Sequence, residues 1–324
     1  MKSKSLFWWL TTVLLITAAS VEAASPKPER IGVIHLGGVL ATVVDGLRAG
    51  LKETGLEEGK QIILEIQDLK GDANLAENAA QKFERDKLGL IFTINAPVTA
   101  GAIKGTKNTP IVFAVGTDPV AQGYVQSFGR PGGRLTGVQY LARDLTPKRL
   151  EILKEIFPKL RRVVTVYDSR NKVSLEGAKL GREEAKRTGV NLTERQVETA
   201  DQLKKALAAI KGGEFDAYLY IADPMIAVQA QLVVDAARAK KLPTMFHDQI
   251  VVANGALASY GQNYFEIGRR SAKYVRQILS GASPAELRVE TIEDVELAFN
   301  LKTAKEIGVT IPPNVLARAV KVIR

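Results

Sequence analysis

Polar residues that could bind a small solute follow many of the predicted strands of this 324-residue chain. In an open parallel sheet, ligands bind outside the carboxyl ends of the strands. The side chains best suited to recognition stand at or just beyond such ends: His35, Asn95, Thr99, Asp118, Tyr167, Ser169, Asp223 and His247. We therefore predict a ligand-binding site assembled from these eight residues.

The chemistry available to this set is the recognition of a zwitterion. A helix N-terminus such as the one after Ala96 offers free N–H groups to a carboxylate. Thr99 and Ser169 can add hydroxyl donors, while the carboxylates of Asp118 and Asp223 can accept hydrogen bonds from an ammonium group. These residue types therefore predict non-covalent binding of a small charged molecule.

Each member of the set also has a purely structural alternative. Asp118 and Asp223 each precede a proline and could cap the helix that follows. His35 and His247 could be buried imidazoles, and Thr99 could lie on a helix surface. Three tyrosines could form aromatic walls or could pack in the core instead: Tyr140, Tyr167 and Tyr260. The sequence leaves both alternatives open for all of them.

Enzymatic chemistry has little support in the sequence. The absence of Cys excludes thiol catalysis, disulfides and Cys-based metal sites, and two histidines are too few for a multi-histidine metal centre. No glycine-rich nucleotide loop and no Gly-x-Ser-x-Gly elbow occurs. A triad could be drawn from either histidine with an Asp and Ser169, but no motif supports it. We therefore expect neither catalysis nor a cofactor.

The composition describes a folded globular protein with a basic surface. Hydrophobic residues make up 46% and charged residues 25% of the chain, and the net charge is +10. Basic residues form only scattered pairs, such as Arg161-Arg162 and Lys240-Lys241, without a nucleic-acid-binding motif. We therefore expect no nucleic-acid partner, and nothing in this surface charge predicts a stable oligomer.

The first 23 residues have the pattern of a secretory signal peptide. Lys2 and Lys4 precede an uncharged apolar stretch from Leu6 to Ala19, and small residues flank position 22. This stretch is shorter than the roughly 20 apolar residues of a membrane span. No Cys follows the expected cleavage site near Ala23, as a lipoprotein would require. We expect a mature protein in the periplasm.

Short apolar runs alternate with helical patterns along the remainder of the chain, which predicts βαβ units and parallel sheets. The predicted strands are Ile31–Leu36, Gln61–Gln67, Leu88–Ile94, Pro110–Val115, Arg162–Tyr167, Val190–Val197, Asp216–Ala222, Pro243–Phe246, Ala256–Tyr260 and Val295–Phe299. The predicted helices are Leu40–Leu51, Asn74–Asp86, Pro97–Thr106, Leu175–Thr188, Asp201–Lys211, Met225–Lys240 and Tyr264–Ser280. The segment Gln126–Gly137 is a poor helix and a poor strand.

The two halves of the chain resemble each other. The segments around Thr54, Pro97 and Pro110 can be aligned with those around Thr188, Pro224 and Pro243, in the same order and at nearly the same offset. Three ordered matches favour an internal duplication. We therefore expect two similar α/β lobes with a hinge and a ligand cleft between them.

Four longer strings identify a family. Pro110–Val120, Arg130–Gly137, Lys148–Glu155 and Asn300–Pro313 resemble the substrate-binding proteins of ABC transporters, in the subfamily that includes tryptophan and tyrosine receptors. The resemblance extends from Ile31 to Arg324. It implies the type I periplasmic binding protein fold, with two doubly wound, Rossmann-like parallel-sheet lobes joined by a multi-strand hinge. It also implies closure on a small solute and docking to an inner-membrane ABC permease. Because the surface charge gives no reason to expect a stable oligomer, we expect a monomer.

The resemblance also suggests how the chain is divided between the lobes. We expect residues 30–138 and 262–289 in the first lobe, and residues 139–261 and 290–324 in the second. The sequence departs from the aromatic amino-acid receptors at His35–Gly38, Asp168–Ser174 and Asp223–Met225. The resemblance implies an amino acid or a related compound as the ligand, but because of these departures the specificity of those receptors does not transfer safely, and a different small solute is the alternative. The alternative function is a periplasmic sensor that docks a membrane signalling receptor.

Overall fold

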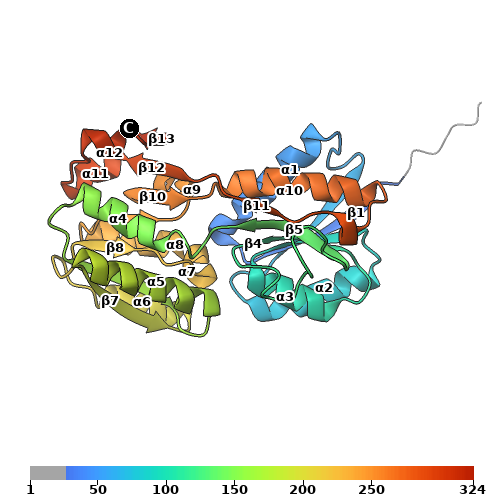
Figure 1. Cartoon of the computed structure of the whole chain (residues 1–324), viewed down its shortest axis with the longest axis horizontal. Coiled ribbons are helices and arrows are strands. Elements are labelled where there is room, and N and C mark those ends of the chain that lie inside the picture. The colour runs from blue at the N-terminus through green and yellow to red at the C-terminus, as the bar shows by residue number, and fades with distance from the viewer. Residues whose placement is uncertain (1–26) are drawn as a thin grey trace, which may run out of the picture.

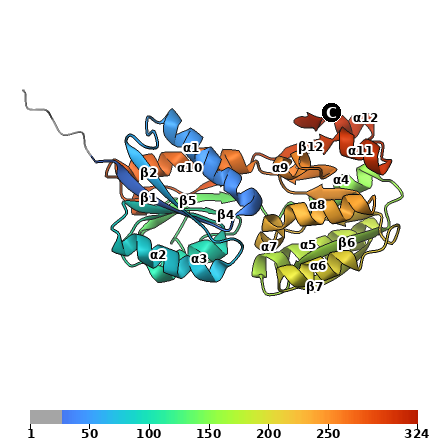
Figure 2. The same cartoon turned by 180° about the vertical axis from the view of Figure 1, so that it is seen from behind.

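Two α/β lobes lie side by side in the computed structural model, which describes residues 27–324 (Figures 1 and 2). The predicted signal peptide, residues 1–23, lies outside the described residues. Each lobe contains one twisted sheet with helices on both faces. Within residues 27–324, no helix combines the length and the apolar character needed to cross a membrane.

The first lobe is built on a six-stranded parallel sheet in the order β11-β5-β4-β3-β1-β2. Its strands are β1 (Glu29–His35), β2 (Ile62–Asp68), β3 (Leu90–Ile94), β4 (Ile111–Val115), β5 (Leu135–Tyr140) and β11 (Glu290–Ile292). Its helices are α1 (Ala41–Glu53), α2 (Ala76–Arg85), α3 (Ala96–Gly105) and α10 (Tyr264–Leu279), with short 3-10 turns η1 (Gly38–Leu40), η2 (Ala73–Leu75) and η3 (Pro284–Glu286). Helices α1 and α10 cover one face, and α2 and α3 cover the other (Figure 1).

The second lobe has a seven-stranded sheet in the order β13-β12-β10-β9-β8-β6-β7, in which only the pair β10–β12 is antiparallel. Its strands are β6 (Arg162–Asp168), β7 (Asn191–Val197), β8 (Ala217–Leu219), β9 (Thr244–Phe246), β10 (Ala258–Gly261), β12 (Glu296–Asn300) and β13 (Lys321–Ile323). Its helices are α4 (Thr146–Ile156), α5 (Lys172–Thr188), α6 (Ala200–Ala208), α7 (Pro224–Val228), α8 (Ala230–Ala239), α9 (Gln249–Ala253), α11 (Leu301–Ile307) and α12 (Pro313–Leu316).

The expected similarity of the two halves is visible in the sheets. The order β5-β4-β3-β1-β2 of the first lobe returns as β10-β9-β8-β6-β7 in the second, each strand five places later in the chain. Pro97 and Pro224 lie in the first turn of the equivalent helices α3 and α7, and Gly55 and Gly189, both at positive φ, follow α1 and α5. The predicted doubly wound fold with two parallel-sheet lobes is confirmed.

Two segments differ from their predicted secondary structure. Leu135–Tyr140 forms strand β5, although its first residues belong to the stretch predicted to be irregular. Glycine is required at position 137, because a Cβ there would lie 2.0 Å from the Phe113 carbonyl oxygen of β4 and would prevent the two strands from pairing. The single helix predicted for Met225–Lys240 is two helices, because the backbone leaves helical geometry at Gln229.

Three chain segments connect the lobes, after β5, after β10 and after β11 (Figure 1). The first crossing follows Tyr140, since β5 belongs to the first sheet up to that residue. The third crossing follows Ile292, whereas the sequence predicted that the second lobe begins at residue 290. The reason is that Glu290–Ile292 pairs with β5 of the first sheet. This strand therefore belongs to the first lobe and not to the second, where the sequence placed it.

The first lobe depends on very close packing of α1 against α10. Gly46 and Gly50 of α1 face Gly268 and neighbouring residues of α10 without intervening side chains. A Cβ on Gly268 would lie 1.8 Å from the Val43 carbonyl oxygen, and one on Gly46 would lie 1.9 Å from that of Phe265. Backbone atoms cannot move aside as a flexible side chain can, so both positions require glycine.

Substitution of Gly268 by Ala should therefore destabilise the protein. We expect the free energy of unfolding to fall by at least about 2 kcal/mol, because the added methyl group forces α1 and α10 apart. Denaturant unfolding followed by circular dichroism measures this. Gly212→Ala is the matched control, because Gly212 is exposed and a Cβ there meets no atom within 4 Å. A Gly268→Ala protein as stable as this control would contradict the packing described.

Candidate functional site

The sheet topology places a cleft where the two lobes face each other. In the first lobe the chain runs from β1 to β2 on one side and then returns to β3 on the other side of β1. In the second lobe β6, β7 and β8 are arranged in the same way, so each lobe has a topological switch point beside its first strand. Ligands of doubly wound sheets bind in the crevice at the carboxyl ends of the strands beside such a point. The carboxyl ends of β3 and β8, which follow the switch points, lead directly into the pocket walls.

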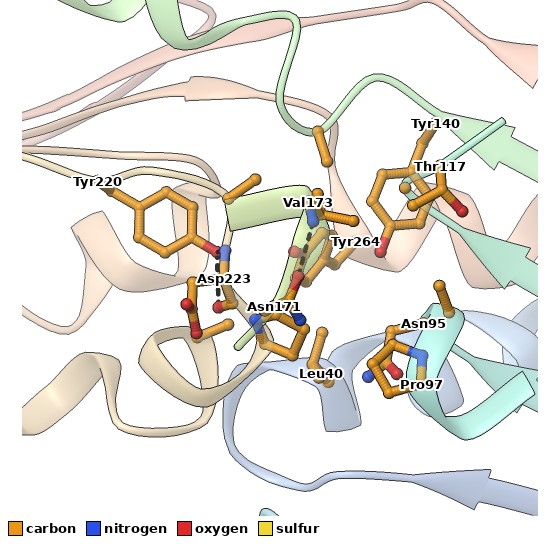
Figure 3. Close-up of a pocket in the computed structure, with 16 residues that line it drawn as sticks. Leu40, Asn95, Pro97, Thr117, Tyr140, Asn171, Val173, Tyr220, Asp223 and Tyr264 are labelled. Atoms are coloured by element: carbon orange, nitrogen blue, oxygen red, sulfur yellow. Dashed lines mark hydrogen bonds between the residues drawn. The ribbon is translucent and has the colours of Figure 1, made fainter. Parts of the chain in front are cut away.

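The main pocket lies between the lobes and encloses about 450 Å³, including its mouth. Figure 3 shows residues of the first lobe, among them Asn95, Pro97 and Thr117, facing residues of the second across this space. The complete lining is Leu40, Asn95, Ala96, Pro97, Gly116, Thr117, Tyr140, Ala142, Asn171, Val173, Tyr220, Ala222, Asp223, Pro224, Ala227 and Tyr264. Most of these side chains are apolar or aromatic, as is usual for small-molecule sites.

Asn95 stands out among the polar lining residues. It is the N-cap of α3, and its Oδ1 accepts a hydrogen bond of 3.2 Å from the Val98 N–H. Its φ of 74° and ψ of 161° lie in a region that normally requires glycine. Its Nδ2 is buried and has no hydrogen-bond partner among the described residues. A strained backbone that holds an unsatisfied donor in a pocket wall indicates a ligand contact.

Three tyrosines form the aromatic wall of the pocket. The rings of Tyr140 and Tyr264 meet edge to face with their centroids 6.0 Å apart. The ring of Tyr220 stacks on that of His247 with centroids 4.1 Å apart. Burial raises the pKa of all three phenols, so they are neutral hydrogen-bonding groups at neutral pH. The buried hydroxyl of Thr117, also without a partner in residues 27–324, adds a second unsatisfied polar group to the wall.

Asp223 and Asn171 shape the wall contributed by the second lobe. Asp223 caps α7 through the Ile226 N–H and also accepts hydrogen bonds from the Asp168 N–H and the Ser174 hydroxyl. Burial raises the pKa of its carboxyl despite these donors. Asn171 caps α5, and its Oδ1 accepts from the Val173 N–H at 2.9 Å (Figure 3). Asp223 is therefore both a cap and a lining residue.

His247 lies in a smaller chamber behind the tyrosine wall. This inner chamber encloses about 240 Å³ and shares Tyr140, Tyr220 and Tyr264 with the main pocket. Neither ring nitrogen of His247 has a hydrogen-bond partner among the described residues, although the side chain is only 5% exposed. Burial and the nearby Arg149 guanidinium hold the pKa of this imidazole well below its usual value, so it is neutral at neutral pH.

Asp248 connects the second lobe to the start of α10. One carboxylate oxygen caps α9 through the Ile250 N–H at 2.7 Å, and the other accepts from the Tyr264 N–H at 2.8 Å. Burial, together with the nearby Glu296 carboxylate, raises the pKa of Asp248 to about 6. The same hydrogen bond helps to place the Tyr264 ring in the pocket wall.

The eight residues predicted from the sequence do not all come together. Asn95 and Asp223 line the main pocket, and His247 lines the inner chamber. His35 and Thr99 are buried beside the cleft but line neither cavity. The Nδ1 of His35 accepts a hydrogen bond from the Gly37 N–H. The hydroxyl of Thr99 donates a hydrogen bond to the Asn95 carbonyl and shares another with the Thr93 hydroxyl.

The other three predicted residues also line neither cavity. Asp118 accepts hydrogen bonds from the N–H groups of Val120 and Ala121 in the turn of residues 119–123. No helix follows it in residues 119–134, so the helix cap that the sequence left open is not formed. Tyr167 is fully buried, and its hydroxyl donates to Glu194. The N–H of Ser169 donates to the Val197 carbonyl. A role for these five residues in binding stays a prediction that their positions do not support.

Several lining residues were missed by the sequence analysis. Tyr220 follows β8 at the strand end, where the same rule that selected Asp223 could have found it. Tyr140 was considered as a wall and lines the pocket, whereas Tyr260 does not. Tyr264 opens α10, and no local signal marks it. Within residues 27–324, no three His, Asp or Glu side chains are grouped to hold a metal ion.

Comparisons with known proteins agree with this architecture. The family described as "ABC transporter substrate binding protein" matches residues 31–323. The chain is 28% identical over 287 residues to the "Tyrosine-binding protein" of Clostridioides difficile, covering 87% of this chain and 81% of that protein. It is 23% identical to an uncharacterized protein of Rickettsia prowazekii, covering 92% of this chain and 90% of that protein.

Solved structures show the same similarity. A conserved domain protein from Vibrio cholerae has a TM-score of 0.83 at 29% identity, covering 91% of this chain and 100% of its own. A Streptococcus pneumoniae ABC domain in complex with L-Trp has a TM-score of 0.81 at 25% identity, with the same coverage. The ligand-free, open structure of a substrate-binding protein from Clostridium difficile has a TM-score of 0.63 at 27% identity, covering 91% and 99%. The chain belongs to the ABC transporter substrate-binding protein family, as its sequence motifs indicated.

The strain at Asn95 leads to a prediction about stability. In Asn95→Gly, loss of the cap should cost a few tenths of a kcal/mol, whereas relief of the backbone strain is worth about 1–3 kcal/mol. We expect the free energy of unfolding to be unchanged or higher in this variant. Denaturant unfolding measures it, and Asn263→Gly, at a helix cap with an ordinary φ of −77°, is the control that should be destabilised. A loss of more than 1 kcal/mol in Asn95→Gly would contradict the strain.

The raised pKa of Asp248 predicts that the stability of the folded protein depends on pH. Its folded-state pKa of about 6 exceeds the ordinary 3.8, so the folded protein binds this proton more tightly than the unfolded chain. The stabilising contribution is complete below pH 3.8 and is lost as the pH rises through 6, by about 2–3 kcal/mol in total.

Unfolding at several pH values, compared with Asp248→Asn, isolates this contribution because the other titrating groups cancel. The stability of the wild type relative to the variant should fall between pH 4 and 7. A constant difference between the wild type and Asp248→Asn would show that folding does not raise the pKa of the Asp248 carboxyl.

Proposed function

We propose that this protein captures an aromatic amino acid, or a closely related solute, between its two lobes and delivers it to an ABC permease. The observation that carries the proposal is the pocket between the lobes, which is walled by three tyrosines and is otherwise largely apolar. Aromatic rings prefer edge-to-face and offset packing against one another, so such a wall favours an aromatic solute.

The relatives support the same class of ligand. The Clostridioides difficile relative is named for tyrosine, and the Streptococcus pneumoniae structure contains L-Trp. The departures at His35–Gly38 and Asp223–Met225 argue that the polar contacts of those receptors are not all retained. We therefore propose an aromatic side chain for the ligand and leave the particular amino acid to experiment.

The arrangement of the lobes supports binding by closure. Gly38 of the first lobe touches Val228 of the second, since a Cβ on Gly38 would lie 2.7 Å from the Val228 Cα. The described conformation is also more similar to the L-Trp complex than to the ligand-free, open structure, with TM-scores of 0.81 and 0.63. We infer that it represents the closed state, and that contacts from both lobes to a solute favour this state over an open one.

The cellular setting is part of the proposal. With residues 1–23 removed as a signal peptide, the protein would act as a periplasmic monomer that docks an inner-membrane permease. The family is one of transporter components. We therefore propose transport and do not propose the signalling alternative.

Direct titration with ligands tests the proposed function. Trp8 and Trp9 are the only tryptophans of the chain, so the mature protein would lack any, and the fluorescence anisotropy of added L-Trp would report binding directly. Dye-detected melting can then compare L-Trp, L-Tyr, L-Phe and L-Leu. A ligand at about 100 times its Kd should stabilise the protein by about 2.7 kcal/mol.

A pocket-filling variant provides the control. Val173→Phe should weaken binding of the aromatic amino acids at least tenfold, because the larger ring occupies their space. Leu175→Phe, on the same helix but exposed and outside the lining, should bind normally. If no aromatic amino acid binds, or if Val173→Phe has no effect, the proposed ligand class or the proposed pocket is wrong.

A further inference from the structure

The inner chamber is a polar extension of the main pocket. It is lined by Leu141, Arg149, His247 and Gln262, together with five residues that it shares with the main pocket: Tyr140, Ala142, Tyr220, Ala222 and Tyr264. The space in it that is open to a water-sized group is about 20 Å³, which is too small for an aromatic ring but holds a single small polar group. A molecule in the main pocket can therefore extend a terminal group past the tyrosines.

Arg149 is a buried cation without an anionic partner. Its side chain is 1% exposed and makes no ion pair with any Asp or Glu of residues 27–324. Nε donates to the Tyr260 carbonyl at 2.8 Å, and Nη1 donates to the Ala142 carbonyl at 3.3 Å. The guanidinium lies 5.8 Å from the Tyr220 ring centroid. Burial lowers the pKa of Arg149 to about 10, so the group is still charged at neutral pH.

Anchoring the hinge explains only part of this arrangement. Tyr260 and Ala142 lie next to two of the three crossing segments, so the two hydrogen bonds of Arg149 hold these segments together. A guanidinium has five N–H donors, however, and its net charge is not compensated by carbonyl groups. An uncompensated buried charge strongly destabilises a folded protein. A purely structural role could be filled by a neutral donor at lower cost.

His247 provides a second, independent observation. Its side chain lines the same chamber, neither ring nitrogen has a partner among the described residues, and stacking on Tyr220 fixes the plane of the ring. The neutral imidazole can donate from one nitrogen and accept at the other. By contrast, the amide of Gln262 in the same chamber pairs with the Leu141 backbone once its oxygen and nitrogen are exchanged. The chamber therefore holds a guanidinium without an ion-pair partner and an imidazole without a hydrogen-bond partner among the described residues.

We propose that the inner chamber binds the carboxylate of the solute, with Arg149 as its counter-ion and His247 as a second hydrogen-bonding partner. This inference rests on the proposed function, because it assigns one end of the ligand that the main pocket receives. Guanidinium–carboxylate pairs are among the strongest charge-assisted contacts in proteins. The carboxylate thus enters the hinge region and not the helix N-termini at the pocket mouth. Solutes that lack an anionic end should be rejected.

Matched ligands test the assignment without changing the protein. L-Trp and indole-3-propionate both carry a carboxylate, whereas L-tryptophanamide and tryptamine keep the indole ring but lack it. We expect the two acids to bind at least tenfold more tightly than the two neutral or cationic analogues in competition titrations. Equal binding of tryptamine and L-Trp would overturn the inference while leaving the proposed function intact.

A second measurement does not depend on the identity of the natural ligand. His35 and His247 are the only histidines of the chain, so two imidazole signals are expected in the NMR spectrum. Benzoate should shift the His247 signal and leave that of His35 in place, whereas benzamide should shift neither. If no aromatic amino acid binds but benzoate moves His247, the proposed function fails and the carboxylate site is supported. If benzoate moves neither signal, the carboxylate site is overturned.

Variants of Arg149 complete the test. Arg149→Gln should reduce affinity for L-Trp and indole-3-propionate at least tenfold and should abolish the preference for acids over amides. Arg195→Gln is the matched control, because Arg195 also bonds a backbone carbonyl and lies over an aromatic ring, far from the pocket. An Arg149→Gln protein that still prefers acids tenfold would refute the role of Arg149. If this variant fails to fold, the ligand pairs and the histidine signals decide the question with the unchanged protein.

Discussion

The parallel pairing of strands within each sheet determines where this protein can bind a solute. All parallel strands of a lobe end at the same edge, so polar residues far apart in the sequence meet there. The core strands β3 and β4 are fully buried and carry no polar group suited to recognition other than at their ends. Because the chain repeats the same strand order in both lobes, it forms two such edges, and the three crossing segments turn them toward each other.

Much of this architecture follows from local sequence patterns. Buried parallel strands appear as short apolar runs, and prolines at helix starts mark equivalent positions in both lobes. The strand-end rule found Asn95 and Asp223, but it could not separate lining residues from caps, because Asp118 and Asp223 look alike in sequence.

Only part of the inner chamber could be predicted in the same way. His247 follows β9 and was selected as a strand-end residue, whereas Arg149 lies on α4, about a hundred residues earlier, where no strand-end signal marks it. Their proximity is created by the crossing of three chain segments, as Arg149 bonds carbonyls at two of them. The family string that contains Arg149 marked the residue as part of a resemblance only. Long-range contacts of this kind are set by topology and leave no periodicity in the sequence.

The site combines two kinds of unfavourable local structure, and each has a function in the proposed mechanism. The glycine-like backbone of Asn95 destabilises the empty protein, as does the uncompensated charge of Arg149. A solute that bonds the Asn95 amide and pairs with Arg149 and His247 satisfies the buried amide and compensates the buried charge, although the backbone strain of Asn95 remains, and it does so only when the lobes enclose it. Ligand binding and closure are then coupled through the same contacts, because an open cleft would let water solvate these groups and would remove the advantage of the ligand.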